Sequence, residues 1–176
     1  MRLCDIVVLD ETYVTTKFTR LRGRSRRGER LVARVPYGQW ELLTVLAAIT
    51  VHGPLAAVSV RAAADSDVFR AFVDHALVPA LRPGQVVVMD NLAVHKVRGV
   101  AESVVRAGCR VVYLPPYSPD LSPIECVFAK FKQHLRSAQA RTVPALHEAV
   151  GHAPAAITAA DCRGCFNHCG YSLQRS

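Results

Sequence analysis

Three acidic residues in this chain of 176 residues could together hold divalent metal ions. Asp10 and Asp90 each directly follow a short apolar run, and Glu125 lies just inside a predicted helix. Three carboxylates suit Mg²⁺, which takes few protein oxygens and keeps its other positions for water and phosphate. Two such ions can activate a nucleophile and stabilise the leaving oxygen of a phosphodiester. The three acids are therefore candidates for metal-dependent phosphoryl chemistry.

Each of these acids also has an ordinary structural explanation. Aspartate favours turns, so Asp10 or Asp90 could simply end a strand. Residues 122–125, Ser-Pro-Ile-Glu, fit a capping box in which Glu125 would only accept a backbone hydrogen bond. Against capping, Glu125 falls between Leu121 and Phe128, at the border of the apolar helix face, where a metal ligand could face the strand ends. The local sequence leaves both explanations open.

Apolar runs and helical periodicity predict an alternating α/β domain. The expected strands cover residues 6–9, 42–51, 55–60, 86–89 and 110–113. The expected helices run from residue 66 to the proline at 79, from 97 to 108, from 121 to 136 and from 142 to 152. A stiff connector with four prolines covers residues 114–123, and the tail from Asp161 has no clear pattern. We expect one domain, an α/β mixed sheet flanked by helices, in which neighbouring strand ends bring Asp10 and Asp90 together.

Positive charge is concentrated in one segment of the chain. The net charge is +8, and residues 17–34 hold eight of the 22 lysine and arginine residues against a single acid. This composition is typical of a phosphate-binding surface, because arginine pairs bidentately with phosphate, but a solvated loop would have the same composition. The candidate phosphate-binding residues in this segment and on the helix after Glu125 are Arg20, Arg22, Arg24, Arg26, Arg27, Arg30, Lys130, Lys132 and Arg136.

Several function classes lack support in the sequence. No apolar run reaches the roughly 20 residues of a membrane helix, and the acid within the N-terminal apolar stretch is unlike a signal peptide. The chain contains no glycine-rich phosphate loop, nucleophile elbow or zinc-protease motif. Because the sequence shows no export signal, we expect the six cysteines to be free thiols. Cys162, Cys165, His168 and Cys169 have partial zinc-ligand spacing but lack a second, separated ligand pair.

Two long motifs carry a family resemblance. VVVMDNLAVHK and RVVYLPPYSPDLSPIECVFAKFK resemble the catalytic core of bacterial insertion-sequence transposases related to mariner elements, which are DDE-superfamily endonucleases. The N-terminal LDET, the arginine-rich segment through ELLT and the terminal CGY are also similar to one branch of that group. The resemblance implies a ribonuclease-H-like fold and a catalytic triad of Asp10, Asp90 and Glu125 that holds two Mg²⁺ or Mn²⁺ ions. The 34 residues between Asp90 and Glu125 fit the family's D-D-E pattern.

The resemblance also implies further residues, a function and partners. Glu11, Asn91, His95 and Lys96 lie at motif positions beside the acids and are candidates for lining the site, although a helix-start role for His95 is simpler. The implied function is DNA strand cleavage and strand transfer at insertion-sequence ends. The implied partner is DNA, at both the element ends and the target, bound by a homodimer. The implied location is cytoplasmic and nucleoid-associated.

The chain departs from the family pattern in two places. Ser122 stands where the family usually has asparagine, and either residue can cap a helix. Only nine residues precede Asp10, where the family carries helix-turn-helix modules, so we expect element-end recognition to come from a separate upstream helix-turn-helix polypeptide. A catalytically silent DNA-binding transposase remnant or regulator is the alternative. Another ribonuclease-H-like nuclease, such as a resolvase, is a third hypothesis.

Overall fold

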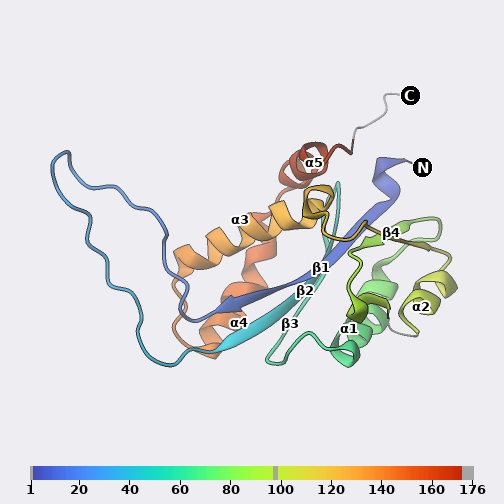
Figure 1. The fold of residues 1–176 in the computed structure, drawn as a ribbon, viewed down its shortest axis with the longest axis horizontal. Helices are drawn as coiled ribbons and strands as arrows, with labels where there is room; N and C mark the ends of the chain where they lie inside the picture. Colours follow the sequence, from blue (N-terminus) through green and yellow to red (C-terminus); the bar gives the residue numbers. More distant parts are fainter. Residues whose placement is uncertain (1, 97–98, 172–176) are drawn as a thin grey trace.

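The computed structural model describes residues 2–96 and 99–171 of the chain. These residues form a mixed sheet of five strands in the order β3-β2-β1-β4-β5, with helices on both faces (Figure 1). The strands are β1 (Ile6–Thr15), β2 (Leu42–Thr50), β3 (Gly53–Val60), β4 (Val86–Met89) and β5 (Arg110–Tyr113). The predicted fold class is confirmed, and the bounds of β4 and β5 agree with those expected from their apolar runs.

β1 lies in the middle of the sheet and is longer than its sequence predicts. It pairs in parallel with β4 as far as Val8 and Val88, and antiparallel with β2 as far as Thr15. The prediction that the strand stops before Asp10 was wrong, because β2 supplies hydrogen-bond partners beyond the end of β4. Asp10 and Glu11 therefore lie inside a strand, at the point where its parallel neighbour ends.

Side chains of β1 alternate between two hydrophobic layers. Val8 and Val14 belong to the layer covered by α3, α4 and α5, whereas Val7 and Leu9 belong to the layer covered by α1 and α2. The helices are α1 (Ser66–Phe72), α2 (Val100–Arg106), α3 (Pro123–Ala138), α4 (Val143–His152) and α5 (Ala159–His168). None of the helices in the described ranges has the length and apolar character needed to cross a membrane.

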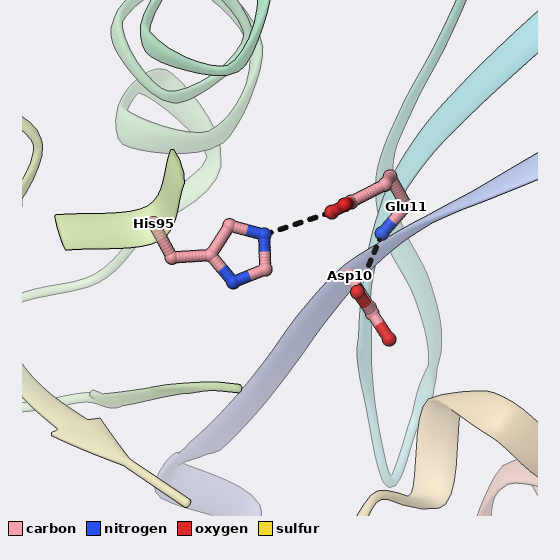
Figure 2. A group of neighbouring side chains, drawn as sticks. All are labelled: Asp10, Glu11 and His95. Atoms are coloured by element: carbon pink, nitrogen blue, oxygen red, sulfur yellow. Dashed lines mark hydrogen bonds and ion pairs between the residues drawn. The ribbon is translucent and has the colours of Figure 1, made fainter. Parts of the chain in front are cut away.

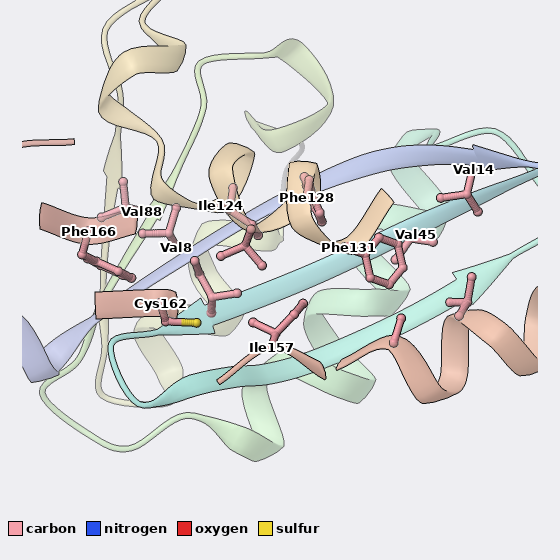
Figure 3. Packing of buried hydrophobic residues seen from close by; sticks show 14 of the residues in the cluster. Val8, Val14, Val45, Val88, Ile124, Phe128, Phe131, Ile157, Cys162 and Phe166 are labelled. Atoms are coloured by element: carbon pink, nitrogen blue, oxygen red, sulfur yellow. The ribbon is translucent and has the colours of Figure 1, made fainter. Parts of the chain in front are cut away.

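α3 packs one apolar face across the sheet. Ile124, Phe128 and Phe131 are almost completely buried and point towards the strands (Figure 3). Leu121, which the periodicity placed at the start of this face, instead precedes the helix and is 40% exposed. The helix begins at Pro123, whose fixed φ angle suits the first turn and whose missing N–H has no intrahelical partner to lose there.

No sequence pattern indicated α5, which lies in the tail that the sequence left unassigned. Its buried residues are Cys162 and Phe166, which lie near Val8 and Val88 of the sheet (Figure 3). Two residues four positions apart make too narrow a stripe to stand out as helical periodicity. The helix nevertheless closes one end of the hydrophobic layer beneath α3.

A long loop, residues 18–41, leaves the sheet between β1 and β2 (Figure 1). Its stem is closed by Thr16 and Glu41, whose backbone N–H and carbonyl groups lie 3.1 Å apart. Arg141 donates hydrogen bonds from its guanidinium group to the carbonyls of Thr16 and Phe18. The arginine-rich segment is thus anchored at its base and exposed to solvent beyond it.

Asp161 provides a test of how α5 is held. Its carboxylate accepts hydrogen bonds from Lys130 of α3 and from Thr158 at the helix start, and these bonds hold its pKa well below the usual range. Because folding lowers this pKa, the stabilisation is present above about pH 4 and is lost as the pH falls. We expect Asp161→Asn to lower the melting temperature at pH 7, with the difference from wild type shrinking towards about pH 2.

Thermal denaturation followed by circular dichroism at the two pH values would measure this difference in melting temperature. Glu148→Gln, on the exposed surface of α4, is the matched control and should have little effect at either pH. A loss of stability for Asp161→Asn that is equal at both pH values would contradict the proposed linkage.

Candidate active site

Asp10, Asp90 and Glu125 line one cleft of about 310 Å³. Asp10 comes from the middle of β1, Asp90 directly follows β4, and Glu125 lies in the first turn of α3. The other residues that line the cleft are Asn91, Leu92, Leu114, Pro115, Pro116, Tyr117, Ser118, Pro119 and Ser122. The structure therefore brings the three acids singled out in the sequence to a shared space.

The register of the sheet explains why the two aspartates lie together. β1 and β4 run parallel with Val8 opposite Val88, and each aspartate lies two residues further along its chain. β4 ends at Met89, so the parallel ladder stops before it reaches Asp10. Asp10 shares the face of Val8, and α3 covers that face with Glu125 in its first turn.

Glu125 does not form the capping box that its sequence fits. Ser122 is the N-cap residue of α3, but its side chain makes no capping hydrogen bond. Glu125 itself is exposed and lines the cleft. The backbone N–H of Ser122, which would donate to Glu125 in a capping box, instead donates to the carbonyl of Pro119 over 2.9 Å, so the cap does not use the Glu125 carboxylate. The first turn of α3 therefore presents this side chain without using it to cap the helix.

Asp10 is buried, with only 9% of the residue exposed. Burial raises its pKa to about 7, and the charges of Glu11 and Asp90 add to the rise, although the backbone N–H of Glu11 donates to Oδ1 over 2.8 Å and opposes it. A bound cation would favour the ionised form and reverse this balance. A buried acid beside two other carboxylates fits a cation site, and an all-oxygen set suits Mg²⁺ or Mn²⁺.

Glu11 points to the opposite face of the sheet, towards His95 (Figure 2). The Nε2 atom of His95 lies 2.8 Å from Oε2 of Glu11, and the imidazole ring packs against Phe69 with 4.3 Å between ring centroids. Its Nδ1 atom is in ion-pair contact with Oδ1 of Asp90 but makes no regular hydrogen bond within the described residues. His95 is completely buried, so the simple helix-start role suggested by the sequence does not describe it.

The environment of His95 favours its charged form. Burial lowers its pKa, but the hydrogen bond that the imidazole donates to Glu11 and the charges of Glu11, Asp90 and Asp10 outweigh burial and raise the pKa above its ordinary value. No sequence pattern joined these groups, since Glu11 and His95 are 84 positions apart. The only sequence sign was their place beside Asp10 and Asp90 in the two motifs.

The remaining residues named beside the acids differ in position. Asn91 lines the cleft, whereas Lys96 is exposed and its ammonium lies 5.6 Å from the centre of the Tyr113 ring. The four-proline connector forms one wall of the cleft, a role that the sequence did not predict. Tyr117 in that wall is fully exposed and has a φ angle of 56°. A run of prolines between the last strand and α3 was the available sign of such a rigid wall.

The arginine-rich loop meets α3 away from the acids. Arg20 and Arg22 line a hollow of about 360 Å³ together with Arg136, whose guanidinium lies 4.9 Å from the centre of the Phe18 ring. Lys130 is instead paired with Asp161, and Lys132 is half-buried. The other candidate phosphate-binding arginines, Arg24, Arg26, Arg27 and Arg30, are exposed along the loop.

The cysteine-rich tail offers no comparable site. Cys162 is buried in the hydrophobic layer beneath α3, where burial raises the pKa of its thiol to about 11. Among the described residues, the ligand atoms of Asp10, Glu11 and His95 converge within 4.8 Å of one another, but those of the tail cysteines and His168 do not form such a group. The partial zinc spacing in the sequence is thus the spacing of a packed helix.

The chain matches one protein family and several solved structures. Residues 5–147 match the sequence model of the family described as DDE superfamily endonuclease, and the comparison with curated proteins gave no significant match. The Mos1 mariner paired-end complex with Mn is similar at a TM-score of 0.74, with 19% identity over 94% of this chain and 52% of that chain. The catalytic domain of Mos1 mariner transposase gives 0.71, with 15% identity over 94% of this chain and 76% of that chain.

A more distant likeness extends to a viral assembly. A chain in the simian T-cell lymphotropic virus intasome in complex with PP2A regulatory subunit B56 gamma has a TM-score of 0.57 and 16% identity, over 84% of this chain and 47% of that chain. The structural likenesses establish a ribonuclease-H-like fold. This chain spans about half the length of the Mos1 chain in the paired-end complex. Because the family match covers most of its residues, the chain belongs to the DDE superfamily of endonucleases.

Proposed function

We propose that this chain is a transposase catalytic domain that cleaves DNA strands at insertion-sequence ends and transfers them to target DNA. The observation that carries the proposal is the placement of Asp10, Asp90 and Glu125 on one cleft in a DDE-family fold. The Mos1 structures named with Mn, and with a strand transfer complex, support this function. The domain assignment covers residues 1–176 as one catalytic domain.

The three acids would hold two Mg²⁺ or Mn²⁺ ions as the catalytic triad. Such ions, when bound, activate water and stabilise the leaving 3′-oxygen of a cleaved phosphodiester. Asp10 and Asp90 would provide ligands from the rigid sheet, and Glu125 would close the set from α3. The proline wall and Asn91 would limit where a DNA strand can enter the cleft. In strand transfer, the freed 3′-hydroxyl would take the place of water and attack a phosphodiester of the target DNA, so that a new P–O bond forms as the 3′-oxygen of the target strand leaves.

The basic loop would hold DNA backbone outside the cleft. Its exposed arginines and the hollow shared with Arg136 provide guanidinium groups that suit phosphate. We further propose a homodimer on DNA and a separate helix-turn-helix polypeptide for recognising the element ends. The proposed site of action is nucleoid DNA. A catalytically silent DNA-binding remnant or regulator remains the competing function, and cleavage distinguishes the two.

Asp90→Ala tests the catalytic assignment. We expect strand cleavage of an element-end duplex with Mn²⁺ to fall by more than about 100-fold, because losing even a residue that supports a metal ligand typically reduces activity by 10- to 100-fold. DNA affinity should remain close to wild type, since the acid is no phosphate contact. Asp67→Ala, at an exposed position in α1, is the control and should cleave normally. Equal cleavage by wild type and Asp90→Ala would contradict the catalytic assignment.

Binding of Mn²⁺ provides a test that does not depend on catalysis. At an ion concentration about 100 times the dissociation constant, binding should stabilise the fold by roughly 2.7 kcal/mol and raise the melting temperature by roughly 5–10 °C. Asp10→Asn should abolish most of this rise because it removes a charged ligand, and EDTA should reverse the rise in wild type. A similar rise in Asp10→Asn would place the ion elsewhere.

Salt dependence tests the basic hollow. Each lost phosphate contact should reduce the slope of log affinity against log salt by about 0.9 for duplex DNA. We therefore expect the double variant Arg22→Ala, Arg136→Ala to bind DNA with a slope about 2 units shallower than wild type, measured by fluorescence anisotropy. Arg70→Ala, which breaks an ion pair with Asp74 in the layer of α1, is the control and should leave the slope unchanged. Unchanged slopes for both variants would remove the hollow from the DNA-binding surface.

A further inference from the structure

We propose that Glu11 and His95 are a positioning pair that fixes the carboxylate of Asp90 from the opposite face of the sheet. This inference rests on the proposed function, because it assumes that Asp90 is a metal ligand. It assigns the two residues a role distinct from that of the triad, since neither lines the cleft. Their task would be to hold one ligand in a single orientation before an ion binds.

A continuous line of contacts joins the three side chains. Nε2 of His95 lies 2.8 Å from Oε2 of Glu11, and Nδ1 of the same ring contacts Oδ1 of Asp90. Figure 2 shows the first nitrogen directed at Glu11 and the second directed away from it. The exposed fraction rises along this line, from 0% for His95 and 11% for Glu11 to 34% for Asp90. A buried anchor therefore reaches a carboxylate that opens to solvent.

Asp90 needs such support more than Asp10 does. Asp10 lies inside β1, where its backbone is held opposite Ala47 of β2. Asp90 instead follows the last residue of β4, and its Oδ1 atom otherwise accepts only from the backbone N–H of Leu92, over 3.1 Å, within the described chain. A side chain beyond the end of a strand is free to rotate unless other groups restrain it. The ring of His95 lies in the short 3-10 helix Ala93–Lys96 and provides that restraint, because it is itself held by Glu11 of the neighbouring strand β1.

The pair is better suited to positioning than to binding an ion itself. The His95 ring is completely buried and lies against Phe69, which leaves no space for the water molecules that Mg²⁺ retains. Glu11 already occupies the hydrogen-bonding direction of Nε2. Metal ligands in proteins are commonly oriented by hydrogen-bonded outer residues, and losing these residues typically weakens binding or activity by 10- to 100-fold. Glu11 and His95 fit this outer position behind Asp90.

Glu11→Gln, His95→Gln and the double variant test the proposal through Mn²⁺ affinity. Free Mn²⁺ is measured by electron paramagnetic resonance, and strand cleavage is measured across a range of Mn²⁺ concentrations. We expect each single variant to bind Mn²⁺ about 10- to 100-fold more weakly. The double variant should be no weaker than the weaker single variant, because the two residues act as one unit. Excess Mn²⁺ should restore cleavage in these variants but not in Asp90→Ala, which has lost the ligand.

Leu77→Ala is the matched control for a purely structural effect. This substitution removes buried apolar atoms from the same hydrophobic layer without removing a polar contact, so it should lower the melting temperature and leave Mn²⁺ affinity near wild type. Circular dichroism would confirm that each variant is folded at the assay temperature. Should His95→Gln fold poorly, Glu11→Gln still tests the pair, because Glu11 is partly exposed at its edge.

The outcomes separate this inference from the proposed function. Wild-type Mn²⁺ affinity in both single variants, together with loss of affinity in Asp90→Ala, would overturn the positioning pair and leave the catalytic assignment standing. The pair would also be overturned if the double variant bound Mn²⁺ more weakly than the weaker single variant does. Absence of Mn²⁺ binding in the wild-type chain would overturn both.

Discussion

The unequal lengths of β1 and β4 are the constraint on which the candidate site depends. β1 has 10 residues and β4 has four, and the two are paired only near their starts. Where β4 stops, β1 continues because β2 still pairs with it on the other side. Asp10 is therefore held by a rigid strand yet borders an open cleft. A metal ligand requires this combination of a fixed backbone and a side chain that borders a cleft.

Charge imposes the second requirement on the same place. Two carboxylates about 5 Å apart repel by roughly 3 kcal/mol at an effective dielectric constant of 20, so a group of acids is unfavourable without cations. The fold offsets part of this repulsion internally, since His95 contacts Asp90 of the cleft and also Glu11 on the opposite face of the sheet. Protonation of Asp10 removes another part of the repulsion, and a bound divalent ion would replace that proton. The cleft is thus built to gain stability from the ligand that its chemistry needs.

Sequence patterns predicted the local features and failed where distant segments cooperate. Val86 to Met89 could be assigned as a strand because its apolar run is self-contained. The continuation of β1 past Asp10 could not, because it depends on β2, which lies beyond a long loop. The burial of His95 depends on Phe69 and Glu11, which come from two other segments. Glu125 was ambiguous for a similar reason: the local sequence fits a capping box, and only the position of α3 over the sheet favours the cleft.

Asp10 and Glu11 are adjacent in sequence but serve opposite faces of one strand, and this restricts how the gene can change. Inserting or deleting one residue in the first half of β1 would exchange their faces, placing the longer acid towards the cleft and the shorter one towards His95. Substitutions that preserve chain length avoid this exchange. The loop of residues 18–41 carries no such alternation, and closing a longer loop adds little free energy. Length variation among relatives should therefore concentrate in that loop and be absent from the strand that precedes it.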